Sequence, residues 1–144
     1  MAPTLCYEME YPQTKTFRLH YALRHLVETV FLLWLMVACL QQWIQPHLEN
    51  ALETGQGHPE FLLYHCLAMA VPSNIIWMIW FVWFFHCWLN FLAEILMFSD
   101  REFYRDWWNA HDVQSFWKAW NIPVHKWCAR HIYKPLLRSG YSKG

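Results

Sequence analysis

The sequence predicts an all-α membrane protein, with two transmembrane helices and amphipathic interfacial helices that form part of a larger multi-span fold. Three observations support this fold class. Aromatic residues make up 19% of the 144 residues, and 11 of them are Trp. Charged residues make up only 15%, against about 25% in soluble domains. Between Arg24 and Arg101 there is no Lys or Arg, and such a block is typical of a membrane-spanning region.

The zero net charge of the chain is the sum of three unlike segments. Residues 1–24 contain three basic and two acidic residues. Residues 25–98 contain five acidic residues and no Lys or Arg, and residues 99–144 contain eight basic and four acidic residues. We expect these to be a cytosolic N-terminal segment, a transmembrane region and a cytosolic amphipathic segment. The balanced total charge gives no general attraction to nucleic acid, which is therefore not an expected partner.

Two apolar runs, at about residues 26–44 and 75–98, are long enough to cross the roughly 30 Å hydrocarbon core of a bilayer. The apolar run 61–71 is too short to span, and Pro72 follows it. That run either lies in the interface or extends the second helix through a proline kink. A buried hairpin of a soluble protein is the alternative reading, and the absence of Lys and Arg from both runs disfavours it.

The basic residues also predict the orientation of the two spans. They precede the first span and follow the second, whereas the connecting loop, residues 45–60, contains none. The positive-inside rule then places both ends of this segment in the cytosol and the loop in the lumen.

Neither a disulfide framework nor a metal site is expected. The five cysteines include no CxxC pair, so we interpret them as free thiols. His125, Cys128 and His131 recur every three residues, but the set lacks a fourth ligand and the usual spacing of a zinc site.

A polar stripe, formed by His86, Asn90 and Glu94, follows one face of the second span. Such side chains are costly in lipid, so this face must meet other protein or a wet cavity. It is either a site of interhelical polar packing or the wall of a reaction chamber or substrate path. Two spans alone cannot shield it. The covering helices come from the same chain or from a second copy, which leaves a homo-oligomer open.

The segment after the second span begins with an aromatic-rich motif. Its residues are Phe103, Tyr104, Arg105, Asp106, Trp107, Trp108 and Asn109. The spacing of Phe103 and Trp107 predicts an amphipathic interfacial helix. Asp112 is expected to cap a second short helix that carries Phe116, Trp117 and Trp120. From these residues alone, a simple membrane-surface anchor remains open.

The next segment, WNIPVHKWCARHIYKP, predicts a helix that starts near Pro123 and ends at Pro135. Asn121 then lies just before a helix N-terminus, which favours negative charge, and His125 lies in the first turn. A basic ridge repeats every four residues, at Lys126, Arg130, Lys134 and Arg138. This ridge either faces anionic lipid headgroups or recognises a phosphate-bearing ligand such as acyl-coenzyme A.

These motifs resemble the membrane-bound O-acyltransferases of the sterol and diacylglycerol branch. FYRDWWN, residues 103–109, matches the FYxDWWN signature of that family. The segments APTLCYE, HCWLNFLAE and WNIPVHKWCARHIYKPLLR resemble its diacylglycerol O-acyltransferase type 1 members, and the resemblance covers nearly the whole chain. The sterol O-acyltransferases share the DWWN core but not NIPVHKW, so an enzyme of that kind is the weaker alternative.

The resemblance implies transfer of a fatty acyl group from acyl-CoA to 1,2-diacylglycerol in the endoplasmic reticulum membrane, which gives triacylglycerol. The implied partners are membrane lipid and the two substrates, with no cofactor besides the substrate acyl-CoA. The resemblance places Asn121 and His125 near the thioester. The remaining acyl-CoA-binding residues that we expect are Trp107, Trp108, Trp120, Lys126 and Arg130.

The catalytic His of the family lies in a further span, downstream of the basic segment, in a His-Glu motif. No His of this chain is directly followed by Glu. We therefore expect no catalytic residue among these 144 residues, and a fragment or truncated form that is inactive alone. The alternative is a non-catalytic isoform that binds lipid or modulates a full-length acyltransferase. The NIPVHKW match disfavours a plain membrane-shaping hairpin.

Overall fold

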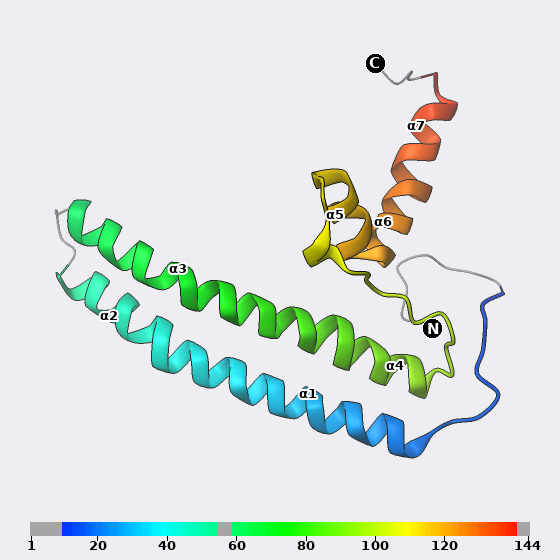
Figure 1. Ribbon diagram of the computed structural model, residues 1–144, viewed down its shortest axis with the longest axis horizontal. Helices are drawn as coiled ribbons and strands as arrows, with labels where there is room; N and C mark the ends of the chain where they lie inside the picture. The colour runs from blue at the N-terminus through cyan, green and yellow to red at the C-terminus, as the bar shows by residue number, and fades with distance from the viewer. Residues whose placement is uncertain (1–9, 55–58, 141–144) are drawn as a thin grey trace. The chain divides into compact units, whose positions relative to one another are not determined.

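A computed structural model describes residues 10–54 and 59–140 of the chain (Figure 1). The motif APTLCYE, residues 2–8, lies outside the described residues. Within them, the regular structure is helical apart from one isolated β-bridge, so the all-α fold class is confirmed. The elements in chain order are α1 (Leu19–Cys39), π-helical η1 (Leu40–Ile44), α2 (Gln45–Thr54), α3 (Pro59–Phe81), π-helical η2 (Val82–Trp88), α4 (Leu89–Ile95), the 3₁₀ turn η3 (Trp107–Asn109), α5 (Val113–Trp120), α6 (Ile122–Cys128), π-helical η4 (Ala129–Tyr133) and α7 (Lys134–Arg138).

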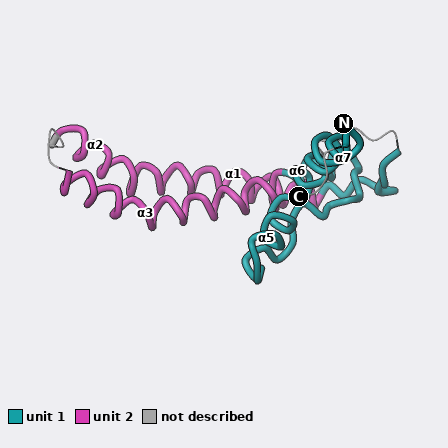
Figure 2. Tube along the Cα trace, turned by 90° about the horizontal axis from the view of Figure 1, so that it is seen from above, with its two compact units in different colours: residues 1–19, 89–144 teal, residues 20–88 magenta. Residues whose placement is uncertain are grey.

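The chain divides into two compact units, which Figure 2 shows in different colours. Unit 1 comprises residues 1–19 and 89–144, and unit 2 comprises residues 20–88. The three segments expected from the charge pattern are defined by their relation to a membrane. The units are defined by packing within the chain, so the two divisions are independent of one another.

Unit 2 is a helical hairpin in which α1, η1 and α2 run beside α3 in the opposite direction (Figures 1 and 2). Its helices belong to two continuous helical stretches, Leu19–Glu53 and Pro59–Ile95, which are long and apolar enough to cross a membrane. Large apolar side chains remain exposed along the hairpin, with Val27 at 67% and Trp34 at 64%. A soluble bundle buries such side chains, so the exposed apolar faces favour contact with lipid.

The connection between the long helices is shorter than the charge pattern predicts. Where the sequence suggests a loop over residues 45–60, helix α2 continues from η1 to Thr54. Pro46 is the second residue of α2 and follows directly after the π-helical turn η1, where the regular i→i−4 hydrogen bonding is interrupted and the missing N–H of proline is tolerated. The apolar run 61–71 lies within α3, which continues through Pro72. Of the two alternatives for that run, the extension of the second helix is therefore the one observed.

The second long helix ends at Ile95, three residues before the predicted end of the span. Met97 adopts a positive φ of 51°, which breaks the helical path, and Phe98 pairs with Gln13 in an isolated antiparallel bridge. The backbone N–H of Thr14 donates to the carbonyl of Met97 at 2.8 Å. In unit 1, the segment that precedes the first helix is thus attached to the end of α4.

Candidate functional site

The aromatic-rich motif is an extended segment, so the prediction of an amphipathic helix there is wrong. Only Trp107–Asn109 is helical, as a single 3₁₀ turn. The backbone N–H of Arg105 donates to the carbonyl of Ala119 at 2.8 Å, and that of Ile122 donates to the carbonyl of Phe103 at 3.0 Å. These bonds to a later part of the chain replace the i→i−4 bonds of a helix, because each backbone group in the interior needs a partner.

The same two bonds fix the motif, residues 103–109, against the junction between α5 and α6. Ala119 and Ile122 lie on either side of Trp120 and Asn121, so the motif runs next to both residues. Two motifs that are separate in the sequence therefore form one structural site.

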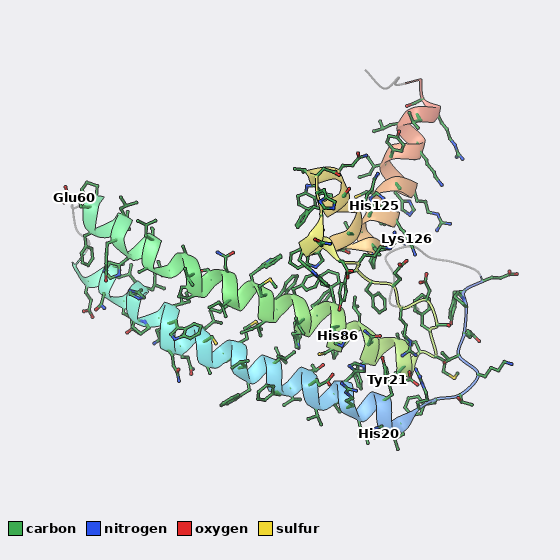
Figure 3. All side chains as sticks on the ribbon, in the orientation of Figure 1. His20, Tyr21, Glu60, His86, His125 and Lys126 are labelled. Carbon is green, nitrogen blue, oxygen red and sulfur yellow. The ribbon has the colours of Figure 1, made fainter. Side chains whose placement is uncertain are left out.

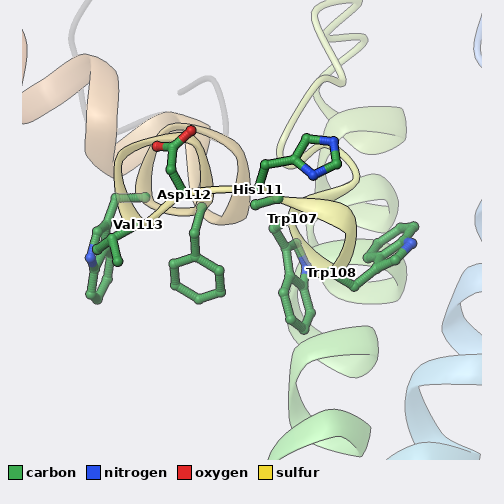
Figure 4. Close-up of a pocket in the computed structure, with 8 residues that line it drawn as sticks. Trp107, Trp108, His111, Asp112 and Val113 are labelled. Atoms are coloured by element: carbon green, nitrogen blue, oxygen red, sulfur yellow. The ribbon is translucent and has the colours of Figure 1, made fainter.

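A pocket of about 630 Å³ opens beside the 3₁₀ turn (Figure 4). We refer to it as the aromatic pocket, and its lining residues are Trp107, Trp108, Ala110, His111, Asp112, Val113, Phe116 and Trp117. Figure 4 shows Trp107 and Trp108 on one side and Val113 on the other. Trp107 is buried and meets Phe116 edge to face, with ring centroids 5.8 Å apart, whereas Trp108 is 61% exposed. Trp107 thus stabilises the wall, while most of the Trp108 side chain remains open to solvent.

A second pocket, of about 490 Å³, lies on the polar side of the motif. We refer to it as the polar pocket, and its lining residues are Arg105, Asp106, Asn109, Ala110, His111, Ser115 and Ala119. Nε and Nη2 of Arg105 donate to the carboxylate of Glu102 at 2.7 and 2.9 Å. These hydrogen bonds lower the pKa of Glu102 and raise the pKa of Arg105, so both groups stay ionised. Ala110 and His111 border both pockets, so an aromatic and a charged surface adjoin at this motif.

Trp120 contacts the aromatic pocket without lining it. Its ring stacks on Phe116 with centroids 6.3 Å apart and an interplanar angle of 6°, and it meets Trp117 edge to face. Trp120 therefore positions two lining residues, and its own side chain is not part of the pocket wall.

Asn121 caps helix α6, which begins beside Pro123 as the sequence predicts. Oδ1 of Asn121 accepts a hydrogen bond from the backbone N–H of Val124 at 3.2 Å. Nδ2 of the same side chain has no hydrogen-bond partner among the described residues, so it is available as a donor. His125 lies exposed in the first turn of α6, next to Lys126 (Figure 3).

The basic ridge is exposed on one continuous helical segment, α6, η4 and α7. Within it, Nζ of Lys126 pairs with the carboxylate of Asp100 at 3.2 Å. The prediction that Pro135 ends the helix is wrong, because α7 continues to Arg138. Pro135 lies in the first turn of α7, directly after the π-helical turn η4, and there its missing N–H is tolerated.

Glu94, the last member of the polar stripe, is fully buried in unit 1 and pairs with two arginines. The backbone N–H of Arg18 donates to Oε1 at 2.8 Å, and Nη2 of Arg18 donates to Oε2 at 2.9 Å. Nη2 of Arg101 lies 2.6 Å from Oε2. Asn90 is buried one turn earlier in α4, and His86, in unit 2, meets His25 edge to face with ring centroids 5.7 Å apart. The partners of Glu94 come from the segments that flank the long helices.

Asp112 caps α5, as its position in the sequence predicts, and this cap gives a pH-dependent prediction. Oδ2 accepts a hydrogen bond from the Ser115 hydroxyl and Oδ1 accepts one from its backbone N–H, both at 2.7 Å, and these bonds lower the pKa of Asp112. The stabilisation is therefore complete above the ordinary Asp pKa of about 3.9 and is lost as the pH falls below it. We expect the hydrogen-exchange protection factor of the Ser115 amide to fall in that range. Asp112→Asn should keep a cap, because asparagine also accepts N–H bonds at a helix start, but it should lose this pH dependence. If protection of the Ser115 amide in Asp112→Asn fell with pH as it does in the wild type, the Asp112 carboxylate would not be its cause.

Two clusters in unit 2 were not among the predicted site residues. Nδ1 of His47 lies 3.2 Å from Nδ1 of buried His65, and His25, Glu28 and Cys87 lie together elsewhere in the hairpin. The partners are 18 residues apart in the first cluster, and 59 residues separate Glu28 from Cys87 in the second. The spacing of residues along the sequence could not predict these contacts, because they depend on how the two long helices pair.

Comparisons with known proteins agree with the resemblance. A family model described as MBOAT, membrane-bound O-acyltransferase family, matches residues 1–144. Diacylglycerol O-acyltransferase 1 of Bos taurus is 48% identical over 143 residues, and so is the protein of that name from Homo sapiens; each match covers 99% of this chain and 29% of the relative. Diacylglycerol O-acyltransferase 1-2 of Oryza sativa subsp. japonica is 44% identical over 144 residues, which cover 30% of it. The chain therefore spans less than a third of the length of these relatives.

Proposed function

The chain belongs to the membrane-bound O-acyltransferase family, and on that premise we propose that it forms the acyl-CoA side of a diacylglycerol acyltransferase. The proposed reaction moves a fatty acyl group from the thioester of acyl-CoA to the free hydroxyl of 1,2-diacylglycerol. Its products are triacylglycerol and CoA. Acyl-CoA is a substrate in this step, and the proposal includes no further cofactor.

The observation that carries this proposal is the pair of backbone hydrogen bonds that hold residues 103–109 against the α5–α6 junction. Through these bonds, the aromatic pocket, the polar pocket and the cap residue Asn121 belong to one site. Acyl-CoA combines apolar parts with charged phosphates and a reactive thioester, and a site with aromatic, charged and donor groups side by side suits such a ligand.

We assign different parts of the ligand to different groups of the site. The exposed side chain of Trp108 in the aromatic pocket is assigned to stack on a flat or apolar part of the ligand. Arg105 in the polar pocket and the exposed ridge that starts at Lys126 and includes Arg130 offer positive charge to the phosphates. Asn121 and His125, both near the start of α6, face the thioester in this proposal.

The chemical step proposed for the complete enzyme is a substitution at the thioester carbon. The hydroxyl oxygen of diacylglycerol bonds to that carbon while a general base takes its proton. The C–S bond then breaks, and the CoA sulfur leaves and takes up a proton. Nδ2 of Asn121 donates to the carbonyl oxygen as negative charge develops there. The base is proposed to be a histidine outside residues 1–144, as the resemblance implies.

The site is proposed to face the cytosol at the endoplasmic reticulum membrane. The support for this orientation is the distribution of Lys and Arg, which are absent between the two long helices and abundant after the second.

The function is tested by expressing the full open reading frame that encodes this chain in cells that lack triacylglycerol synthesis. Isolated membranes then receive labelled oleoyl-CoA and either 1,2-diacylglycerol or cholesterol. We expect labelled triacylglycerol and no steryl ester. Steryl ester alone would support the sterol O-acyltransferase alternative, and no labelled product from either acceptor would support a non-catalytic protein.

We expect Trp108→Ala to raise the KM for acyl-CoA by roughly fivefold with little change in kcat, because a stacking contact contributes on the order of 1 kcal/mol to binding. Thermal stability should hardly change, since the Trp108 side chain is mostly exposed. Steady-state kinetics on the same membranes measure this effect. Trp34→Ala is the matched control, because Trp34 is 64% exposed but lies in unit 2. An equal rise of KM in both variants would contradict a specific role for Trp108.

A further inference from the structure

Three side chains with metal-ligating atoms converge inside the helical hairpin of unit 2. His25 and Glu28 lie one turn apart in α1, and Cys87 lies in η2. One ligand atom from each, a ring nitrogen, a carboxylate oxygen and a thiol sulfur, lies within 4.8 Å of the other two. Nδ1 of His25 is 3.0 Å from Oε2 of Glu28, and Sγ of Cys87 is 3.8 Å from the same oxygen.

Contacts within the described residues do not satisfy all the polar atoms of this cluster. His25 is only 3% exposed, and neither of its ring nitrogens forms a hydrogen bond within the described residues, despite the short distance to Glu28. Buried polar atoms are normally satisfied, so a buried imidazole of this kind points to a ligand. Cys87 is also buried, and among the described residues its thiol makes only the long contact of 3.8 Å to the Glu28 carboxylate.

We propose that His25, Glu28 and Cys87 bind a divalent zinc ion. A mixed set of nitrogen, oxygen and sulfur atoms suits Zn²⁺, which accepts all three ligand types. In a tetrahedral site with Zn–N and Zn–O distances of about 2.0 Å and a Zn–S distance of about 2.3 Å, nitrogen and oxygen lie roughly 3.3 Å apart and sulfur and oxygen roughly 3.5 Å apart. The distances of 3.0 and 3.8 Å lie within a few tenths of an ångström of these values, and all three ligand atoms lie within 4.8 Å of one another.

The charges of the cluster also suit a divalent cation. A thiolate and a carboxylate together balance the charge of Zn²⁺, and the imidazole binds in its neutral form. Arg24 is the nearby opposing charge, but its Nε donates to Oε1 of Glu28 at 2.8 Å and leaves Oε2 directed to the cluster. Arg24 therefore orients the carboxylate as an outer partner of the site while it weakens the binding of the cation.

The surroundings provide groups that position the His25 ring. Tyr21 meets the His25 ring edge to face at 4.4 Å, and His86 meets it from the other long helical stretch at 5.7 Å (Figure 3 labels both). The fourth position of the ion is left for water. His25 is the seventh residue of α1, about 9 Å along the helix from its start.

The consequence of such an ion is structural. It connects α1 with η2 between residues 59 positions apart, and a ligand that binds only the folded hairpin stabilises it. This zinc site is independent of the proposed acyl transfer, so either proposal can fail without the other.

The test uses the protein in lipid nanodiscs after removal of metal with a chelator. Zinc titration against a chromophoric competitor should show one Zn²⁺ bound per chain. Co²⁺ in place of zinc should give a thiolate-to-cobalt charge-transfer absorption. Cys87→Ser should abolish this absorption and weaken zinc binding by at least roughly tenfold, and His25→Gln should weaken it similarly. Cys39→Ser is the matched control, since Cys39 is also a buried free cysteine of unit 2.

Arg24→Gln separates the metal site from a simple ion pair. Loss of this positive charge should tighten zinc binding severalfold, whereas an Arg24–Glu28 ion pair without a metal site predicts no zinc response at all. The proposal is overturned if the wild-type protein binds no zinc, or if the charge-transfer absorption survives in Cys87→Ser. Should Cys87→Ser fail to fold, His25→Gln is the deciding variant: zinc binding as tight as in the wild type would overturn the proposal.

Discussion

Asn121→Ala should lower kcat for acyl transfer by about 10²–10³-fold, because loss of one oxyanion-stabilising donor typically costs that much. The prediction applies to the full open reading frame, measured as labelled triacylglycerol at saturating acyl-CoA. KM should change little, since the lost hydrogen bond is formed mainly as negative charge develops in the transition state.

The structure gives a physical reason why Asn121 is suited to this role. The cap bond to Val124 occupies Oδ1 and fixes the side chain, while Nδ2 keeps both of its N–H donors. A donor that is already fixed before the reaction needs no reorganisation when charge appears on the substrate. The same arrangement means that an alanine variant loses the cap and the donor together.

Asn121→Asp separates these two losses. Aspartate is as good an N-cap as asparagine, so α6 should keep its stability, but the carboxylate has no N–H to donate. We expect thermal unfolding like that of the wild type together with a loss of kcat at least as large as in Asn121→Ala. The cap itself contributes only about 1 kcal/mol, which is too little to explain a 10²-fold effect. Near-normal activity in Asn121→Asp would show that Asn121 only caps α6 and donates no hydrogen bond to the substrate.

The sequence predicts the helical elements that depend on local chemistry. The two long apolar helices follow from uninterrupted runs of apolar residues, the cap at Asp112 follows from a residue type that accepts N–H bonds at a helix start, and the start of α6 follows from Pro123. The continuation of helix through Pro46, Pro72 and Pro135 was not predictable from the residues alone. Each proline removes one N–H, and the surrounding turns determine whether that loss ends the helix.

The geometry of the candidate site, unlike the helices, was not predictable from local sequence patterns. The aromatic motif has the spacing of a helix, but its backbone bonds to Ala119 and from Ile122 hold it extended. These bonds join positions well separated in sequence, so no local pattern encodes them. The sequence likewise shows that Glu94 needs shielding, but not that Arg18 and Arg101 provide it. Residue types were therefore predictable, and the contacts between distant segments were not.

Glu94→Ala should lower the free energy of unfolding by about 3–5 kcal/mol, the usual loss when one member of a buried ion pair is removed. Glu94 is fully buried, and its carboxylate is the shared partner of Arg18 and Arg101. The Arg101 side chain is only 15% exposed, so without Glu94 its charge would remain poorly solvated. The Arg18 side chain is 53% exposed and can turn to water, so Arg18→Ala should cost clearly less than Glu94→Ala.

Chemical or thermal unfolding in lipid nanodiscs measures the loss of unfolding free energy in Glu94→Ala and in Arg18→Ala. Glu102→Gln is the matched control, because Glu102 also forms a two-bond pair with an arginine, but on the surface of the same unit, where no measurable change is expected. Replacing Glu94, Arg18 and Arg101 together by apolar residues of similar volume should recover much of the stability, since no buried charge is then left without a partner. If Glu94→Ala proved no more harmful than Glu102→Gln, the buried triad would not be what attaches the N-terminal segment to the end of α4.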